Sequence, residues 1–252
     1  MIGAIIGDVV GSRFEFDNTF DYNFKLFTNE SDFTDDSICT VAVADAILTG
    51  TDYRDKLLEW CRRYPCPTGA YGGSFARWIH SSNPQPYNSF GNGSAMRVSP
   101  TAWAFENLDK VLEEAAKTAE VTHNHPEGVK GAVAVAHVIF VLRHSKNQKD
   151  VETIGNQYYP GFMSQQYQRG EFNETCQGTV PVCFKLMLES SSFEDAIRKA
   201  ISWGGDSDTI GAIVGSMAEA LWGVPDEIAE TLLSILPSEM LEVIREFNQR
   251  YL

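Results

Sequence analysis

The sequence has few basic residues for its length. Its 252 residues include 20 lysines and arginines against 34 aspartates and glutamates, which gives a formal net charge of −14. Non-specific binding to nucleic acid depends on Lys and Arg side chains that neutralise phosphates. The shortage of basic residues therefore argues against a nucleic-acid partner.

Cysteine is also scarce, and long apolar runs are missing. The five cysteines form no C-x-x-C pair, and their odd number and scattered spacing favour free thiols in a reducing cytoplasm. The apolar segment at residues 1–7 has no basic flank and meets Asp8, so it does not resemble a signal peptide. No stretch is apolar over the length needed to cross a bilayer. We expect a cytoplasmic protein without a membrane partner.

The composition is otherwise that of a globular protein. Hydrophobic residues make up 43% of the chain and aromatic residues 12%, enough for a large buried core. No repeat, low-complexity tract or linker divides the chain, so we predict one domain over residues 1–252, expected to be a monomer. Apolar periodicity and capping residues predict helices over residues 35–49, 57–64, 108–121, 128–143, 180–188, 193–203, 209–222 and 225–251, the last broken at Pro237.

Two segments are ambiguous in their secondary structure. Residues 128–143 are nearly all apolar, and their alternating Ala and Val residues would also suit a strand, but their length and lack of turn signals favour a buried helix. Residues 20–28 alternate in polarity and could form a loop or a small hairpin. The chain is therefore predicted to be all-α.

Two acidic clusters, near opposite ends of the chain, carry the chemistry. Thr34-Asp35-Asp36-Ser37 and Asp206-Ser207-Asp208-Thr209 each place carboxylates beside hydroxyls at the start of a predicted apolar helix. Helix capping alone would explain one such cluster, but it does not require paired acids. The second cluster is not an EF-hand loop, because Ile210 and Met217 stand where oxygen ligands belong. Carboxylate and hydroxyl oxygens suit hard divalent cations, so the two clusters together predict a site for a pair of ions.

Five motifs in order give the chain a resemblance to a known family. They are residues 7–15 (GDVVGSRFE), 34–37 (TDDS), 90–97 (FGNGSAMR), 122–123 (TH) and 204–209 (GGDSDT). In this order they resemble the motif series of the ADP-ribosylglycohydrolase family, which includes the dinitrogenase-reductase-activating and ADP-ribosyl-acceptor hydrolases. The resemblance extends from Gly7 to about Trp222.

The resemblance implies a fold and a metal site. The expected fold is a compact, orthogonal all-α bundle with two Mg²⁺ or Mn²⁺ ions in a cleft. The residues that match the family's metal ligands are Thr34, Asp35, Asp36, Asp206, Asp208 and Thr209. Ser37 is expected to hydrogen-bond behind the ligands, and Asp8 to hydrogen-bond internally rather than bind metal. Glu15 matches an acid on a loop beside the metals, and residues 16–33 would form a flap over the site.

The resemblance also implies substrate contacts. Phe90 would stack on adenine, and the loop of Gly91, Asn92, Gly93 and Ser94 would contact the diphosphate and ribose, as would His123. A glycine-rich turn that opens a helix exposes N–H groups suited to anions, which agrees with this assignment. The segment at Gly72 and Gly73 is a second glycine-rich helix start that could line the same cleft. Arg97 is expected to form a buried salt bridge.

Zinc is a weaker interpretation of the histidines. His123 and His125 lie two residues apart, but no cysteine or third histidine is near them in the sequence, and structural zinc needs four ligands.

The predicted activity is metal-dependent hydrolysis that removes ADP-ribose from a modified acceptor by cleavage at C1″. The catalytic residues would be Glu15, Asp35, Asp36 and Asp208, with the general base unassigned among the aspartates. The acceptor is expected to be an ADP-ribosylated protein, with arginine linkage favoured, or a small ADP-ribosyl compound. A serine-linked substrate, a small-molecule ADP-ribose ester and a non-catalytic ADP-ribose-binding or structural relative are the alternatives.

Overall fold

The computed structural model describes residues 1–252, and the chain is folded almost entirely into α-helices. They are α1 (Ile2–Gly11), α2 (Asp35–Thr49), α3 (Tyr53–Arg63), α4 (Gly73–His80), α5 (Gly93–Met96), α6 (Ser99–Ala104), α7 (Leu108–Glu120), α8 (Pro126–Ser145), α9 (Asp150–Tyr158), α10 (Cys176–Glu189), α11 (Phe193–Trp203), α12 (Ser207–Trp222), α13 (Asp226–Leu233) and α14 (Ser238–Tyr251). Pairing of extended backbone is limited to two isolated bridges, Thr34 with Thr68 and Gly91 with Thr175. The predicted all-α bundle is confirmed.

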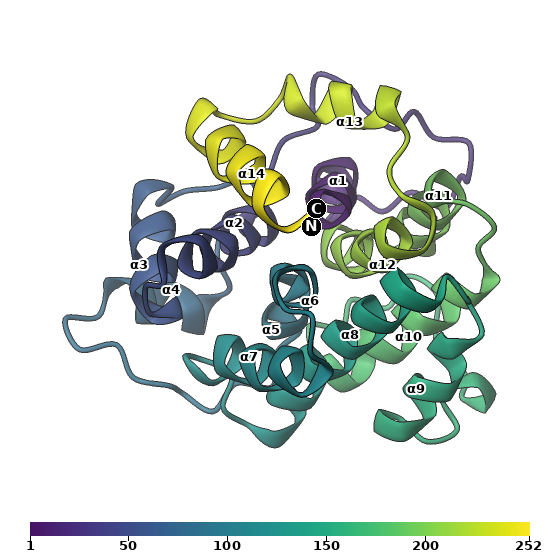
Figure 1. Ribbon diagram of the computed structural model, residues 1–252. Coiled ribbons are helices and arrows are strands. Elements are labelled where there is room, and N and C mark those ends of the chain that lie inside the picture. The colour runs from purple at the N-terminus through teal and green to yellow at the C-terminus, as the bar shows by residue number, and fades with distance from the viewer.

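The first and twelfth helices form the centre of the bundle. Figure 1 shows α1 beside α12, with the other helices arranged around them. A Cβ atom placed on Gly7 would lie 1.9 Å from the carbonyl oxygen of Gly211, and one on Gly3 would lie 2.3 Å from that of Gly215. Only glycine permits so close an approach of two backbones. The glycines, four residues apart on each helix, therefore allow α1 and α12 to pack with their backbones in contact.

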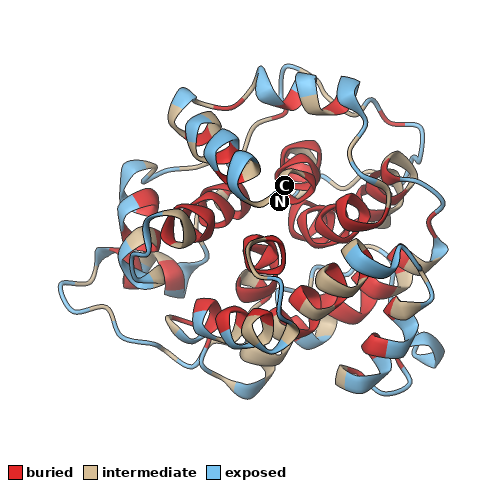
Figure 2. Cartoon of the chain, viewed as in Figure 1, coloured by how far each residue is buried: buried red, intermediate tan, exposed pale blue.

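Several helices are buried on nearly every side (Figure 2). Residues 207–221 of α12 are all buried, as are residues 36–46 of α2. Helices that are apolar around their whole surface lie inside a protein rather than on it. Because α2 and α12 are interior helices, the acidic clusters at their N-termini are also placed inside the molecule.

Most of the helices predicted from the sequence are present. Helix α2 has the predicted bounds and ends at Gly50, which adopts a left-handed conformation with φ of 66°. Residues 128–143 lie within helix α8, so the strand alternative is wrong. Residues 20–28 form turns and irregular backbone rather than a hairpin. Helix α10 begins four residues before the predicted start, because the Thr175 side chain caps it by accepting a hydrogen bond from Gly178 N, and Pro181 lies in its interior.

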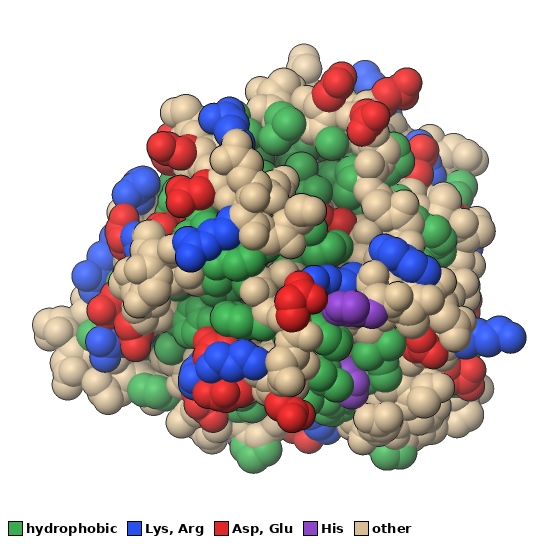
Figure 3. Space-filling model, in the orientation of Figure 1, with side chains coloured by type: hydrophobic (Ala, Val, Ile, Leu, Met, Phe, Trp, Pro, Cys, Tyr) green, Lys and Arg blue, Asp and Glu red, His purple; other side chains and the backbone are tan.

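The surface seen in Figure 3 mixes charges of both signs. Acidic and basic side chains lie next to one another on that face. Ion pairs of the structure include those of Lys110 with Glu113 and Glu114. None of the helices combines the length and apolar character required of a membrane span.

Candidate metal centre and substrate pocket

Asp8 organises the start of helix α2. Its carboxylate accepts hydrogen bonds from the backbone N–H groups of Thr34 and Ser37, both at 3.0 Å, and from the Thr34 hydroxyl at 2.6 Å. The Ser37 hydroxyl also donates to it. The expectation that Asp8 hydrogen-bonds internally is confirmed, and Ser37 is one of its partners. A fully buried carboxylate with four donors holds the first acidic cluster in a fixed orientation.

The two acidic clusters meet through Thr209. The N-terminus of α12 carries Asp206, Asp208 and Thr209, and the Thr209 hydroxyl donates to Asp36 Oδ2 at 3.2 Å across 173 residues of sequence. One oxygen from each of Asp8, Asp36 and Asp208 lies within 4.8 Å of the others, and the same is true of Glu15, Asp206 and Asp208. The fold therefore gathers carboxylates from both ends of the chain into one cluster.

The cluster has far more negative charge than its surroundings compensate. Burial raises the pKa of Asp8 to about 6, and burial together with the charges of Asp8 and Asp206 raises the pKa of Asp35 to about 8. The pKa values of Asp36 and Asp208 are also raised, chiefly by burial. Asp36 is 2% exposed, and its Oδ1 atom has no hydrogen-bond partner. Buried carboxylates normally pair with cations or coordinate metals, so this set of oxygens fits hard divalent ions.

Glu15 lies at the edge of the same cluster. Its Oε2 atom is buried without a partner, and a Cβ atom on Gly69 would lie 2.4 Å from it. The absence of a side chain at Gly69 thus leaves the space that Glu15 occupies. Burial, and then the charges of Asp206 and Asp35, raise the pKa of Glu15 to about 8.

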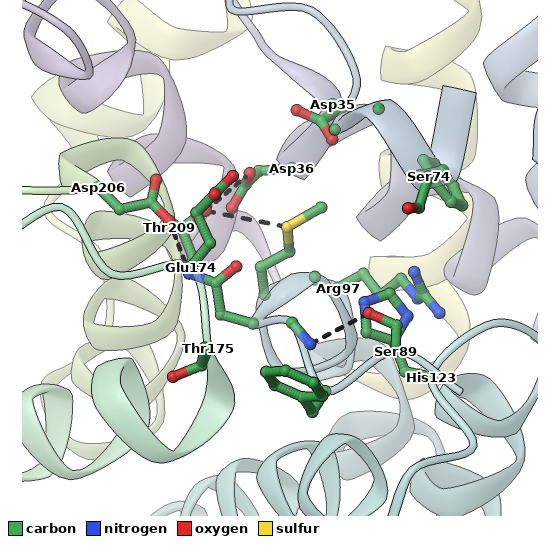
Figure 4. A pocket seen from close by; sticks show the side chains of 18 of the residues that line it. Asp35, Asp36, Ser74, Ser89, Arg97, His123, Glu174, Thr175, Asp206 and Thr209 are labelled. Atoms are coloured by element: carbon green, nitrogen blue, oxygen red, sulfur yellow. Dashed lines mark hydrogen bonds between the residues drawn. The ribbon is translucent and has the colours of Figure 1, made fainter. Parts of the chain in front are cut away.

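The carboxylates line one end of a cavity of about 490 Å³. Its lining includes six acids and one arginine; the acids are Glu15, Asp35, Asp36, Glu174, Asp206 and Asp208. Figure 4 shows Asp35, Asp36 and Asp206 on one side of the space and Arg97, His123 and Ser89 on the other. The cavity is therefore acidic at one end and carries its positive charge at the other.

The predicted glycine-rich loop wraps around His123. A Cβ atom on Gly93 would lie 3.2 Å from His123 Nε2, and one on Gly91 would lie 3.4 Å from it. The His123 Nδ1 atom lies 2.7 Å from the Thr122 hydroxyl, and burial lowers the pKa of the ring well below its usual value. His123 is therefore a neutral imidazole whose Nε2 edge faces the loop and the cavity.

The other predicted substrate residues have different surroundings. Phe90 lines the cavity and is 43% exposed. The Asn92 amide donates to Asp206 Oδ2 at 2.6 Å and to the Thr179 hydroxyl at 3.1 Å, so it positions a member of the acidic cluster. Ser94 is fully buried beneath the loop, where its hydroxyl donates to the Gly128 carbonyl at 2.7 Å.

The predicted salt bridge of Arg97 is wrong. This side chain is 1% exposed, and its guanidinium donates to the Thr118 carbonyl at 2.9 Å and the Thr122 hydroxyl at 2.8 Å rather than to a carboxylate. The Nε atom has no partner. Arg97 lies at the C-cap of α5, and the side chain that it meets is a threonine, which the sequence did not identify.

His125 does not face the cavity with His123. It caps helix α8, where its Nδ1 atom accepts a hydrogen bond from Glu127 N at 3.1 Å, and its ring packs edge-on against Phe90.

The structure also adds a loop that the sequence did not single out. The N–H of Asn92 donates to the Glu174 carbonyl at 2.7 Å, and the N–H of Cys176 donates to the Phe90 carbonyl at 2.9 Å. This bridge brings Glu174 and Thr175 to the cavity. No motif marks them, because their placement depends on pairing between loops that are distant in sequence.

Comparison with known proteins agrees with this geometry. A family model described as ADP-ribosylglycohydrolase matches residues 1–251. The chain is 24% identical to the ADP-ribosyl-[dinitrogen reductase] glycohydrolase of Rhodospirillum rubrum, with 97% of this chain and 91% of that protein covered. It is also 24% identical to the ADP-ribosylarginine hydrolase Tri1 of Pseudomonas putida, over 89% of this chain and 70% of that protein.

The fold is likewise similar to a solved structure. A chain described as an ADP-ribosylglycohydrolase-related protein complex superposes with a TM-score of 0.75 at 20% identity, covering 100% of this chain and 96% of that one.

Proposed function

The chain belongs to the ADP-ribosylglycohydrolase family, and from this premise we propose that it removes ADP-ribose from a modified acceptor by hydrolysing the bond at C1″ of the terminal ribose. The family supports a glycohydrolase activity, and the two relatives named above are a glycohydrolase of ADP-ribosylated dinitrogen reductase and an ADP-ribosylarginine hydrolase. Arginine is accordingly the acceptor we favour.

One observation carries the proposal. The acidic clusters that begin α2 and α12 converge at the acidic end of one cavity, joined by the hydrogen bond from Thr209 to Asp36. The cavity volume of about 490 Å³ lies within the range of small-molecule sites. The opposite end of the cavity is lined by the glycine loop and by the buried guanidinium of Arg97, a combination that suits a diphosphate. The two ends together match a ribosyl diphosphate better than a neutral ligand.

Two Mg²⁺ or Mn²⁺ ions are the proposed cofactors. Their ligands would be oxygens of Thr34, Asp35, Asp36, Asp206, Asp208 and Thr209. When bound, such ions supply positive charge that compensates the carboxylates and makes water a better nucleophile near neutral pH. The unpartnered Oδ1 atom of Asp36 is the feature of this chain that fits such an ion most directly.

The protein's own residues supply the proton transfers. Glycosidic hydrolysis breaks the bond from C1″ to the acceptor atom and forms a bond from C1″ to a water oxygen through an oxocarbenium-like transition state. Glu15, whose buried Oε2 atom has no partner at the edge of the cluster, is proposed to give its proton to the departing acceptor atom. The water proton passes to one of the carboxylates Asp35, Asp36, Asp206 or Asp208.

The remaining cavity residues are proposed to bind ADP-ribose. A side chain at Gly91 or Gly93 would fill the space between the loop and His123. The two glycines leave that space open, so the diphosphate could approach the loop backbone closely. Phe90 is positioned to stack on adenine at the open edge of the cavity. Asn92 and Ser94, predicted as contacts themselves, support the loop through Asp206 and Gly128.

A release assay tests the proposal. Purified protein is incubated with arginine-ADP-ribosylated protein in Mg²⁺ or Mn²⁺, and free ADP-ribose is measured before and after addition of a chelator. We expect release that the chelator abolishes. Asp208→Ala should eliminate release while circular dichroism retains its helical signal, whereas the surface change Asp109→Ala on α7 should leave release intact. Activity that survives both the chelator and Asp208→Ala would exclude the proposed site.

A further inference from the structure

An exposed aromatic pair stands beside the acidic end of the cavity. The rings of Phe16 and Phe172 are stacked, with centroids 5.9 Å apart and planes inclined by 25°. Phe16 is 74% exposed and Phe172 is 45% exposed. Each lies close in sequence to a carboxylate that lines the cavity: Phe16 follows Glu15 directly, and Phe172 lies two residues before Glu174. The rings lie outside the cavity lining, on the two chain segments that bring Glu15 and Glu174 to it.

The two loops that carry this pair are held against the segment that precedes Asp206. The Asn18 amide donates to the Gly205 carbonyl at 2.9 Å and accepts from Gly205 N at 2.7 Å. On the other loop, Gly170 N donates to the Trp203 carbonyl at 3.0 Å. The aromatic rings are thus tied to the same chain segment that enters the acidic cluster, and their position relative to the cavity is fixed by the fold.

Exposure of two adjacent phenylalanines calls for an explanation. Removal of a Phe side chain from water is stabilising, and two rings left exposed in the free chain gain that stabilisation only when a partner covers them. Exposed apolar groups that border a polar cavity commonly mark a recognition site. Because Glu15 is proposed to give its proton to the departing acceptor atom, the group bound beside it would be the acceptor rather than adenine.

The charge at the acidic end of the cavity selects among acceptors. Glu174 is the one acid of the cavity lining that is assigned neither to the metal site nor to proton transfer, and it lies on the same side of the cavity as Asp206 (Figure 4). The only Lys or Arg side chain in the lining is Arg97, on the other side. A cation is therefore favoured at the acidic end. Guanidinium is planar, weakly hydrated and always charged; it stacks on aromatic faces and donates paired hydrogen bonds to carboxylates. A serine side chain would use neither the rings nor the charge.

We propose that Phe16, Phe172 and Glu174 form the acceptor subsite and recognise the guanidinium of an ADP-ribosylated arginine. This inference rests on the proposed glycohydrolase activity and adds the residues that determine its linkage specificity. The exposed face of the ring pair covers one side of the guanidinium, and the Glu174 carboxylate compensates its charge.

Kinetics of variants on three probes test the subsite. The probes are a peptide with arginine-linked ADP-ribose, a peptide with serine-linked ADP-ribose, and free ADP-ribose as a competitive inhibitor. The measured quantity is the ratio of KM for the arginine-linked peptide to Ki for ADP-ribose. It isolates the acceptor contribution, because ADP-ribose lacks the acceptor. A measurable Ki also shows that each variant retains an intact cavity.

The subsite variants are Phe172→Leu and Glu174→Gln, which preserve size while they remove the aromatic face or the charge. We expect each to raise the ratio about 5-fold, the effect of one cation–π contact or one partly exposed charge pair. Glu171→Gln, exposed on the same loop but outside the cavity lining, is the control for Glu174. Phe90→Leu, 43% exposed at the adenine edge, is the control for Phe172. Both controls should keep the ratio within about 2-fold of wild type.

The outcomes separate the inference from the activity on which it rests. Preference of the wild-type protein for the serine-linked peptide, or an unchanged ratio in Phe172→Leu and Glu174→Gln, would overturn the subsite and leave the glycohydrolase proposal intact. Failure to release ADP-ribose from either peptide would overturn the glycohydrolase proposal itself.

Discussion

Replacement of Gly7 by alanine tests how strictly the contact between α1 and α12 positions the acidic cluster. The added Cβ atom would lie 1.9 Å from the Gly211 carbonyl oxygen, whereas ordinary contact begins at 3.4 Å, so the helices must separate by up to 1.5 Å (3.4 minus 1.9). The obstructing atom belongs to the backbone of a buried helix and cannot rotate away.

The magnitude follows from two opposing effects. Overpacking of a core costs about 1–3 kcal/mol, and a backbone clash falls at the upper end of that range. The higher helix propensity of alanine returns about 1 kcal/mol. The net loss of about 2 kcal/mol corresponds to a Tm decrease of about 4–8 °C for a chain of this size. Because Asp8 follows Gly7, and Gly11 packs on the backbone of Asp208, the affinity for Mn²⁺ should also fall about 10-fold.

The assay combines thermal unfolding with a Mn²⁺ titration. Gly73→Ala is the matched control. Gly73 lies in helix α4, and the atom nearest to an added Cβ atom is Arg77 Nη1 at 3.8 Å. The Tm of this variant should be equal to or higher than that of the wild-type protein. If Gly7→Ala melted and bound Mn²⁺ like the wild-type protein, the close helix contact would not be what positions the carboxylates.

Three further predictions concern the cavity. Thr209→Val removes a proposed metal ligand together with the hydrogen bond to Asp36 and should weaken Mn²⁺ binding about 10-fold by calorimetry; equal affinity would show that the Thr209 hydroxyl serves neither role. In the folded protein the pKa is about 6 for Asp8 and about 8 for Asp35, whereas both are near 4 in the unfolded chain. Between the unfolded and folded pKa values the folded state therefore binds more protons than the unfolded state, so its stability must fall as pH rises through that range. With chelator present, Tm should therefore be lower at about pH 8 than at about pH 5, and addition of Mg²⁺ should raise Tm more at about pH 8. A Tm that does not change with pH would contradict the claim that the buried carboxylates lack compensating positive charge. Arg97→Met removes the bonds to Thr118 and Thr122 and should lower the free energy of unfolding by about 3 kcal/mol in urea titrations, whereas a change below about 1 kcal/mol would show that they contribute little.

The interior helices were predictable because their signals are local. Asp35–Thr49 has a capping threonine, a continuous small and aliphatic segment and a terminal glycine, and all three are visible without the fold. Helix α9 at Asp150–Tyr158 escaped prediction because it is short and polar, and its stability comes from packing of Val151 and Ile154 against neighbours that the sequence does not identify.

The acidic clusters were predictable as candidate ligands, since paired carboxylates beside hydroxyls are rare outside such sites. Their environment was not. The dependence of α2 on Asp8, the use of Asn92 to hold Asp206, and the arrival of Glu174 at the cavity all depend on contacts between distant segments. Arg97 was misjudged for the same reason, because its partners come from helix α7 and the turn that follows it.

The central position of α1 has a consequence for how the chain must be made. Gly3 bonds to Glu219, so the surface that α1 needs is made only after 216 further residues have been added to the chain. At roughly 5–20 residues per second, this apolar segment waits about 10–40 s before its partner exists. During that interval the apolar residues of α1 are exposed on the nascent chain. A translational pause before residue 219 should increase capture of this segment by chaperones or its loss to aggregation.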